Sequence, residues 1–184
     1  MREKSRNRPS QPTTHKSRLT THAVSGNAFE RKICKPEDLT ARVAGLKRPL
    51  VFTNGVFDLL HRGHVTYLAQ ARALGASLLV AANSDASARR LEKGAGRPVN
   101  SLEDRLAVLA ALEAVTLVTW FEEETPLDMI LTVKPDVLVK GGDWKPEAIV
   151  SAKEVKGWGG AVRSIPFAHE RSISALIARI RGKS

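Results

Sequence analysis

Residues 49–71 read PLVFTNGVFDLLHRGHVTYLAQA, and this stretch decides the fold. Its first four residues form an apolar run, which a Thr-Asn-Gly sequence follows. Two histidines, His61 and His64, come next, and from Tyr67 onward the apolar residues have helical spacing. The sequence therefore predicts a buried strand that turns directly into a helix, with two imidazoles at the turn.

The position of the two histidines suggests a phosphate site. In open parallel α/β sheets, ligands bind beyond the carboxyl ends of the strands, and phosphates favour the N-terminus of a helix. Two imidazoles there can donate hydrogen bonds to a phosphate, and Gly63 between them leaves the approach free of a side chain. A single histidine at a helix start is usually a solvated or capping residue. The combination of Asn-Gly, Phe-Asp and His-Arg-Gly-His in one strand-to-helix context favours the functional interpretation.

Apolar runs alternate with helical patterns along the rest of the chain. Strands are predicted at 49–54, 77–82, 115–120, 136–140 and 161–165. Helices are predicted at 36–44, 64–74, 101–112, 124–133, 146–157 and 172–181. This alternation implies crossover connections. The predicted fold class is α/β: a single Rossmann-like domain with a five-stranded, mostly parallel sheet flanked by helices, whose polar and glycine-rich strand ends share one edge.

The charge of the chain is concentrated at its start. The 184 residues carry a net charge of +10, with a sequence pI of about 10.2. Residues 1–28 contain six basic residues against one acidic residue, and they are rich in Ser, Thr, Pro and Asn. Such a composition predicts a disordered basic tail over residues 1–30, followed by a folded domain over 31–184. An Arg- and Ser-rich start also resembles an organellar transit peptide, which stays an alternative.

Composition also narrows the classes of partner. A basic chain can bind nucleic acid, a membrane surface or phosphorylated small molecules. Aromatic residues make up only 5%, which argues against stacking on single-stranded nucleic acid, although a nucleic-acid role for the tail stays open. The apolar runs are far shorter than the roughly 20 residues that span a bilayer. The single cysteine, Cys34, suits a reducing compartment. We therefore predict a cytoplasmic protein with no membrane insertion and no nucleic-acid partner.

Further motifs follow the histidines in a fixed order. They are Asn83-Ser84-Asp85, Arg97-Pro98-Val99-Asn100, Lys140-Gly141-Gly142-Asp143-Trp144 and Arg171-Ser172-Ile173-Ser174. Together with the histidine stretch, they resemble the HxGH nucleotidyltransferases over roughly residues 33–182. Within that superfamily they are similar to the branch that adenylylates a heptose 1-phosphate. Ile173 departs from this pattern, because relatives often carry a hydroxyl residue there.

The resemblance implies a reaction. It implies transfer of AMP from ATP to D-glycero-beta-D-manno-heptose 1-phosphate, which gives ADP-heptose and pyrophosphate for lipopolysaccharide core biosynthesis in a Gram-negative bacterium. The cofactor would be Mg²⁺, held mainly by the substrate phosphates, and the protein would be a homodimer. The alternative is a CTP-dependent cytidylyltransferase that acts on a small phosphorylated alcohol such as glycerol 3-phosphate.

The resemblance also assigns site residues. The catalytic residues would be His61 and His64. The nucleotide-binding residues would be Thr53, Asn54, Gly55, Phe57, Gly63, Gly141, Asp143, Arg171, Ser172 and Ser174. The sugar-phosphate-binding residues would be Asp58, Asn83, Asp85 and Lys140. Further phosphate contacts would come from Lys93, Arg97 and Arg105.

Several of these residues have an ordinary structural interpretation as well. Asp58 could cap the helix that follows it, and Lys140 could be a solvated residue at a strand end. Arg97 and Arg105 could form surface ion pairs. Trp144 is expected in the core rather than at the nucleotide. The three glutamates at 122–124 are expected to be solvated at the start of a helix.

Overall fold

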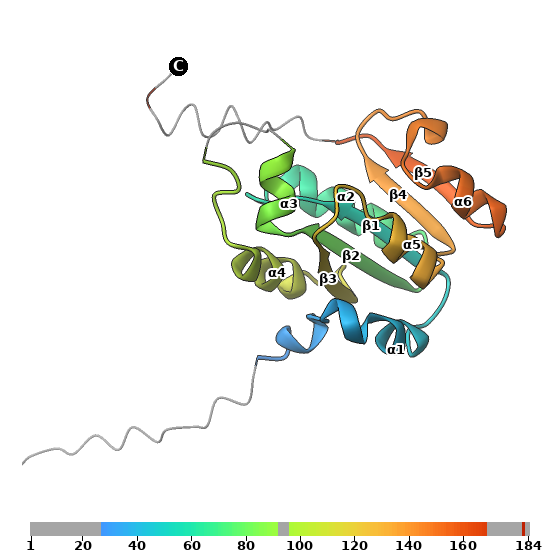
Figure 1. Ribbon diagram of the computed structural model, residues 1–184, viewed down its shortest axis with the longest axis horizontal. Helices are drawn as coiled ribbons and strands as arrows, with labels where there is room; N and C mark the ends of the chain where they lie inside the picture. The colour runs from blue at the N-terminus through green and yellow to red at the C-terminus, as the bar shows by residue number, and fades with distance from the viewer. Residues whose placement is uncertain (1–26, 92–95, 169–181, 183–184) are drawn as a thin grey trace, which may run out of the picture.

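A five-stranded parallel sheet forms the centre of the protein (Figure 1). The computed structural model describes residues 27–91, 96–168 and 182. The strands are β1 (Leu50–Gly55), β2 (Ser77–Asn83), β3 (Leu117–Phe121), β4 (Val137–Gly141) and β5 (Ala161–Ile165). Their order in the sheet is β3-β2-β1-β4-β5, and each neighbouring pair is parallel. The predicted α/β class with a five-stranded sheet is confirmed.

The helices connect the strands in the predicted alternation. They are η1 (Glu30–Lys32), η2 (Pro36–Asp38), α1 (Leu39–Ala44), α2 (Arg62–Arg72), α3 (Asp85–Arg90), α4 (Leu102–Ala111), α5 (Leu127–Val133), η3 (Pro146–Ala148) and α6 (Ala152–Gly157). The helix α3 is not among the helices that the sequence predicts. The helix predicted at 172–181 and most of the basic tail lie outside the described residues.

Two apolar clusters cover the two faces of the sheet (Figure 1). On one face, α2 and α4 contribute side chains such as Leu68 and Leu109. On the other face, α1, α5 and α6 contribute side chains such as Val43, Ile130 and Val155. All seven residues of β2 are buried, which explains why its sequence is a continuous apolar run rather than an alternating one.

The order of the strands reverses at β1. The chain leaves β1 through α2 toward β2 on one side, and β4 later pairs with β1 on the other side. Such a reversal leaves a crevice beyond the carboxyl ends of the two strands, where open α/β sheets bind their ligands. β1 also carries the histidine segment beyond its carboxyl end, so topology and sequence point to the same edge.

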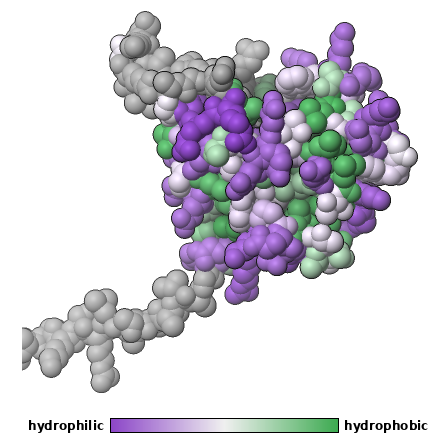
Figure 2. All heavy atoms as spheres, in the orientation of Figure 1, coloured by the Kyte–Doolittle hydropathy of each residue, from purple (hydrophilic) through white to green (hydrophobic). Residues whose placement is uncertain are grey.

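The described surface is polar with scattered apolar residues. Figure 2 shows hydrophilic and apolar residues interspersed on one face of the molecule. The exposed large apolar side chains include Val65, Val99 and Trp144, which come from different elements. Within the described residues, each helix is too short or too polar to cross a bilayer.

Candidate active site

The two histidines cap the helix that they begin. His61 is the N-cap residue of α2, and its Nδ1 accepts a hydrogen bond from the backbone N–H of Gly63 at 3.1 Å. In return, the backbone N–H of His61 donates to Nδ1 of His64 at 3.4 Å. This is the reciprocal arrangement of a capping box, in which Ser or Thr and Glu or Gln usually take these two positions. The centres of the imidazole rings are 4.0 Å apart.

This capping arrangement decides which nitrogen of each neutral imidazole carries the proton. A nitrogen that accepts a hydrogen bond carries no proton, so a neutral imidazole here carries its proton on Nε2. Burial, and secondly the neighbouring His61, lower the pKa of His64 from 6.5 to about 4. His64 is therefore neutral at pH 7 and is a hydrogen-bond donor through Nε2. The predicted role of both histidines as donors to a phosphate stays a prediction, and this tautomer suits it.

Aromatic rings enclose His64. The ring of Phe57 and the ring of Phe167 each lie 6.0 Å from the imidazole in edge-on geometry. Phe167 also contacts Tyr67, with ring centres 5.6 Å apart. A side chain at Gly141 would place its Cβ 2.7 Å from Cζ of Phe167, so this ring explains the glycine. The sequence had attributed Gly141 to nucleotide binding, which stays a prediction. Apolar walls exclude water and strengthen hydrogen bonds inside the site.

The hydroxyl of Thr53 belongs to the interior. Its Oγ1 lies 2.6 Å from the Tyr67 hydroxyl, and both side chains are buried. Burial raises the pKa of Tyr67, so the phenol stays protonated. This bond joins β1 to α2 directly beneath the histidines. Any contact of Thr53 with a nucleotide would therefore come from its backbone.

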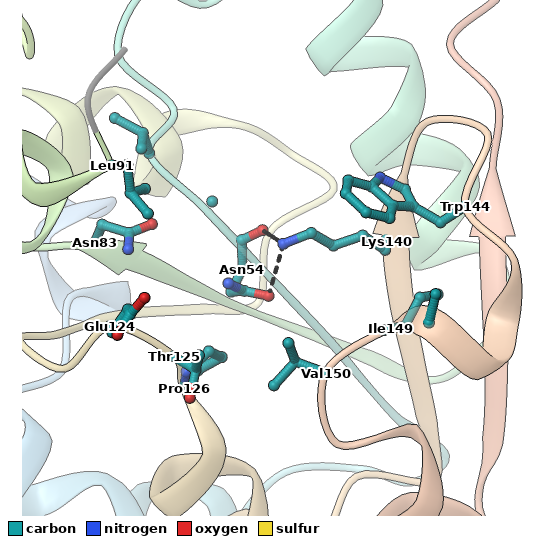
Figure 3. A pocket seen from close by; sticks show the side chains of 13 residues that line it. Asn54, Asn83, Leu91, Glu124, Thr125, Pro126, Lys140, Trp144, Ile149 and Val150 are labelled. Atoms are coloured by element: carbon teal, nitrogen blue, oxygen red, sulfur yellow. Dashed lines mark hydrogen bonds between the residues drawn. The ribbon is translucent and has the colours of Figure 1, made fainter.

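A cavity of about 310 Å³ opens at the carboxyl ends of β1, β2 and β4 (Figure 3), and its lining includes Gly55 and Val56, which lead into the connection that carries the histidines. Asn54 and Lys140 meet there: the Lys140 ammonium lies 3.3 Å from the side-chain oxygen of Asn54 and 3.4 Å from its carbonyl. Asn83 enters from β2, and its amide donates to the Ser87 hydroxyl at 3.0 Å. The cavity thus brings together an ammonium and two amides that the sequence analysis had named.

The cavity is also lined by residues for which the sequence predicted no role in binding. Trp144 is 51% exposed and lines the cavity, so the prediction that it fills the core is wrong. Its indole N–H donates to the carbonyl of Gly141 at 3.2 Å, which holds the ring at the rim. Glu124 and Thr125 line the cavity too, although the glutamate run was expected to be merely solvated. Their position shortly after β3, at the same edge of the sheet as the other cavity residues, is the sequence feature that could have predicted them.

Asp58 is buried, and both oxygens of its carboxylate contact protein groups. Its Oδ1 accepts from the backbone N–H groups of Val99 at 2.8 Å and Asn100 at 3.0 Å. Its Oδ2 lies 2.7 Å from Nε of Arg97, an ion pair whose angles fall short of a hydrogen bond. The N-cap of α2 is His61, so the capping interpretation of Asp58 is wrong. The carboxylate holds a neighbouring loop, and its predicted contact with the sugar phosphate has no support from this geometry.

Arg105 is also inside the protein. Its side chain is 0% exposed, and its Nη2 donates to Oδ1 of Asp85 at 2.7 Å. A surface ion pair is therefore the wrong description. The enclosure of its guanidinium by protein also speaks against the predicted phosphate contact. Asp85 remains 30% exposed at the side chain, and its role toward the sugar phosphate stays a prediction.

The remaining predicted residues divide into two groups. Asp143 and Gly55 lie at the carboxyl ends of β4 and β1, on the same edge as the cavity, and their contacts with the nucleotide stay predictions. Four predicted phosphate or nucleotide residues lie outside the described part of the chain: Lys93, Arg171, Ser172 and Ser174.

Comparison with known proteins identifies the family. Residues 52–180 match the family model described as cytidylyltransferase-like. The chain belongs to this family. The histidine cap, the parallel sheet and the cavity at its carboxyl edge are thus features of a cytidylyltransferase-like domain, and the family resemblance seen in the sequence is confirmed.

Among the curated relatives, a D-beta-D-heptose 1-phosphate adenylyltransferase from Bordetella bronchiseptica is 54% identical over 160 residues. The match covers 86% of this chain and 99% of that protein. The bifunctional protein HldE of Pseudomonas syringae pv. syringae is 48% identical over 179 residues. That match covers 90% of this chain but only 38% of HldE, so much of the bifunctional protein has no counterpart here.

Solved structures agree on the architecture. A lipopolysaccharide core biosynthesis protein from Thermoplasma volcanium GSS1 matches with a TM-score of 0.55 and 30% identity. The match covers 66% of this chain and 98% of that chain. A pantoate-beta-alanine ligase from Francisella tularensis matches with a TM-score of 0.54 at 14% identity, over 77% of this chain and 68% of its own. This second likeness shows the fold alone.

Proposed function

We propose that this protein transfers AMP from ATP to D-glycero-beta-D-manno-heptose 1-phosphate. The products are ADP-heptose, a precursor of the lipopolysaccharide core, and pyrophosphate. The observation that carries the proposal is the capped histidine pair at the N-terminus of α2, on the sheet edge where Asn54, Asn83 and Lys140 line a cavity. The Bordetella bronchiseptica relative, matched over 99% of its length, supports the choice of substrates.

The reaction needs no nucleophile from the protein. An oxygen of the sugar 1-phosphate attacks the α-phosphorus of ATP in line, and the bond from that phosphorus to the oxygen of pyrophosphate breaks. Catalysis then consists of positioning and of stabilising charge on the phosphoryl oxygens. His61 and His64 would donate from Nε2 to these oxygens, and the neutral state of His64 at rest lets it do so without a proton transfer. No general base is required, because the attacking phosphate is already ionised near pH 7.

The cavity suits the sugar phosphate. The Lys140 ammonium would bind the phosphate and the amide of Asn83 would bind hydroxyls, while Asn54, beside Lys140, keeps its predicted contact with the nucleotide. The Glu124 carboxylate can accept hydrogen bonds from vicinal hydroxyls, and the indole face of Trp144 offers an apolar surface for the carbon side of the sugar ring. Amide, carboxylate and aromatic groups of this kind fit a hydroxyl-rich acceptor better than a purely apolar one.

Mg²⁺ would accompany the nucleotide. Among residues 27–91 and 96–168, no group of three or more His, Cys, Asp or Glu side chains could hold a metal ion. We expect the magnesium ion to keep substrate phosphates and water as its main ligands, as is common at nucleotide sites. When bound, the ion would neutralise charge on the departing pyrophosphate.

The test is pyrophosphate release by the purified protein with magnesium. ATP and CTP are each tried with heptose 1-phosphate and with glycerol 3-phosphate. Release with ATP and heptose 1-phosphate alone, and its loss in His64→Gln, is the expected result. Release with CTP and glycerol 3-phosphate would instead establish the alternative cytidylyltransferase, which keeps the fold and mechanism. No release with any pair would overturn the proposal.

Three further predictions accompany this function. We infer a homodimer, which light scattering of the purified protein would test. We infer a cytoplasmic location, which fractionation of the source cell would test. We infer that the tail up to residue 30 binds no nucleic acid, so removing it would leave the salt dependence of polynucleotide binding unchanged.

A further inference from the structure

The helix α4 carries a charged residue on its apolar face. The inward-facing positions of α4 are Leu102, Arg105, Leu106, Leu109 and Ala110. This spacing is that of a core-facing helical stripe. Arg105 occupies one position of the stripe and is among the largest fully buried side chains of the protein.

A buried arginine at such a position is not explained by stability. Removing a guanidinium from water is costly, and replacing a whole buried ion pair by well-packed apolar residues of similar volume is often neutral or stabilising. Leucine fills neighbouring positions of the same stripe. The reason for Arg105 should therefore be found in what its nitrogen atoms hold.

The three bonds of Arg105 reach three separate segments. Nη1 donates to the carbonyl of Val56 at 2.6 Å, in the connection from β1 to α2. Nε donates to the carbonyl of Asn100 at 3.3 Å. Nη2 donates to Asp85 at 2.7 Å, at the start of α3. One planar guanidinium thus ties together three loops that no apolar residue could connect.

The connection that Arg105 holds is strained. Phe57, directly after Val56, has a φ of 48°, a left-handed conformation that is strained for a residue other than glycine. Such a conformation persists only where its surroundings enforce it. Arg105 fixes the peptide that precedes Phe57, and Asp58, which follows it, binds the backbone N–H of Asn100. The residues on both sides of Phe57 are therefore hydrogen-bonded to α4 or to the loop that precedes it.

We propose that Arg105 is a positioning residue that fixes the connection from β1 to α2 and so aims His61 and His64. It acts through Val56, Asp58 and Asn100 and contacts no substrate. The predicted effect on turnover rests on the proposed nucleotidyl transfer. The orientation of the imidazoles can also be measured without any substrate.

The first variant is Arg105→Met, with Arg89→Met as its control. Arg89 is exposed on α3, so the control changes the same charge without touching these loops. Arg105→Met leaves the carbonyls of Val56 and Asn100 and the carboxylate of Asp85 without their donor, so the midpoint of urea unfolding is expected to fall. In the folded protein, kcat is expected to fall about 30- to 100-fold because the histidines are misplaced. KM for ATP should stay within about threefold.

The second variant is Arg105→Lys, which serves if the first does not fold. Its single ammonium can stay with Asp85 but cannot reach both carbonyls, so kcat is still expected to fall about tenfold. Folded variants with unchanged kcat would overturn the proposal. A parallel fall in kcat and in the unfolding midpoint, with the imidazoles unmoved, would reduce Arg105 to a packing role and also overturn it.

Nitrogen NMR of the free protein separates this proposal from the proposed function. In the native protein, His61 and His64 should each give the signals of one fixed Nε2–H tautomer. Arg105→Met should average them, and Arg89→Met should not. If the native protein shows no turnover, the proposed function fails, and the NMR result still decides the role of Arg105: unchanged imidazole signals would overturn it.

Discussion

At the scale of single residues, the histidine pair has two tasks. His61 and His64 complete the hydrogen bonds at the start of α2 through their Nδ1 atoms, and a neutral imidazole in this arrangement carries its proton on Nε2, the atom predicted to donate to phosphate. The sequence predicted the pair at a strand-to-helix turn with phosphate chemistry. It could not predict the mutual capping, because that depends on the backbone of the preceding loop, where Phe57 takes a φ of 48°.

Glutamine can separate the two tasks of His64. Its amide oxygen can accept the bond from the His61 backbone, since glutamine is an ordinary third residue of a capping box. His64→Gln should therefore lower kcat by about 10²-fold or more, because the amide N–H of glutamine is displaced from the position of the imidazole Nε2–H when its oxygen makes the cap. The free energy of unfolding should change by less than about 0.5 kcal/mol. Steady-state kinetics and urea unfolding check both expectations.

His64→Ala is the comparison. It removes the donor and the cap together, so it should lose the same activity and about 1 kcal/mol of stability as well. Equal stability of the two variants would show that the cap contributes nothing, and wild-type activity in either one would remove His64 from the mechanism.

The protonation of His64 should make stability depend on pH. Its pKa is about 4 in the folded protein, below the ordinary value of 6.5. Between these values the unfolded chain binds a proton that the folded protein does not bind, so stability falls as the pH drops from about 6.5 toward 4. Above about pH 6.5 this contribution is constant. Urea unfolding at pH 7.5, 6 and 5 measures the slope.

The same series in His64→Gln provides the control. This variant should lose part of the pH slope in that window, because glutamine does not titrate. An identical slope in both proteins would assign the acid sensitivity to other groups.

At the scale of elements, sequence patterns predicted what local rules control. The apolar run of β2 and the helical pattern of α4 predicted the positions of these two elements to within a few residues. At the start of α4, the Ser101 hydroxyl accepts a hydrogen bond from the backbone N–H of Asp104. The short α3 was missed because a six-residue helix has too little periodicity to detect. Its cap at Ser84 and the bond from Asn83 to Ser87 hold it, and these form only after folding.

Gly75 is required by a close contact with another segment, which the sequence pattern does not reveal. The sequence pattern predicted it as the end of α2, a common place for glycine. In the structure a Cβ there would lie 2.4 Å from the carbonyl oxygen of Pro49 and 2.7 Å from a methyl group of Val51. Gly75→Ala should therefore cost about 1–3 kcal/mol through overpacking against backbone. Thermal or urea unfolding measures the loss.

Gly157 supplies the matched control at the end of α6. A Cβ there meets nothing within 4 Å. Gly157→Ala should raise stability by about 0.4–1 kcal/mol, because it restricts the unfolded chain. Similar changes in the two variants would mean that the close approach at Gly75 is relieved by small backbone shifts.

At the scale of the whole molecule, the site is assembled by topology. Asn54, Asn83 and Lys140 are far apart in sequence, and the parallel sheet brings them to one cavity because their strands end at the same edge. The rule for open sheets predicted this edge. It could not tell which polar residues face the cavity and which turn inward, as Asp58 and Arg105 do, since both kinds follow strands or begin helices.

Lys140 tests this assembly. Lys140→Met should raise KM for the sugar phosphate at least about tenfold, because a charged hydrogen bond to phosphate contributes about 1.5–3 kcal/mol. KM for ATP should change less. Lys153→Met, an exposed change on α6, should alter neither constant. Equal increases for both substrates would place Lys140 at the phosphates that they share rather than at the acceptor.

The half-exposed indole at the rim of the cavity has an optical consequence. Trp144 stands against solvent, whereas the two other tryptophans, Trp120 and Trp158, are partly buried away from this cavity. An occupant that displaces water from the Trp144 ring would shift its emission toward the blue. The protein therefore contains its own fluorophore for acceptor titrations, and Trp144→Phe would provide the blank for the same measurement.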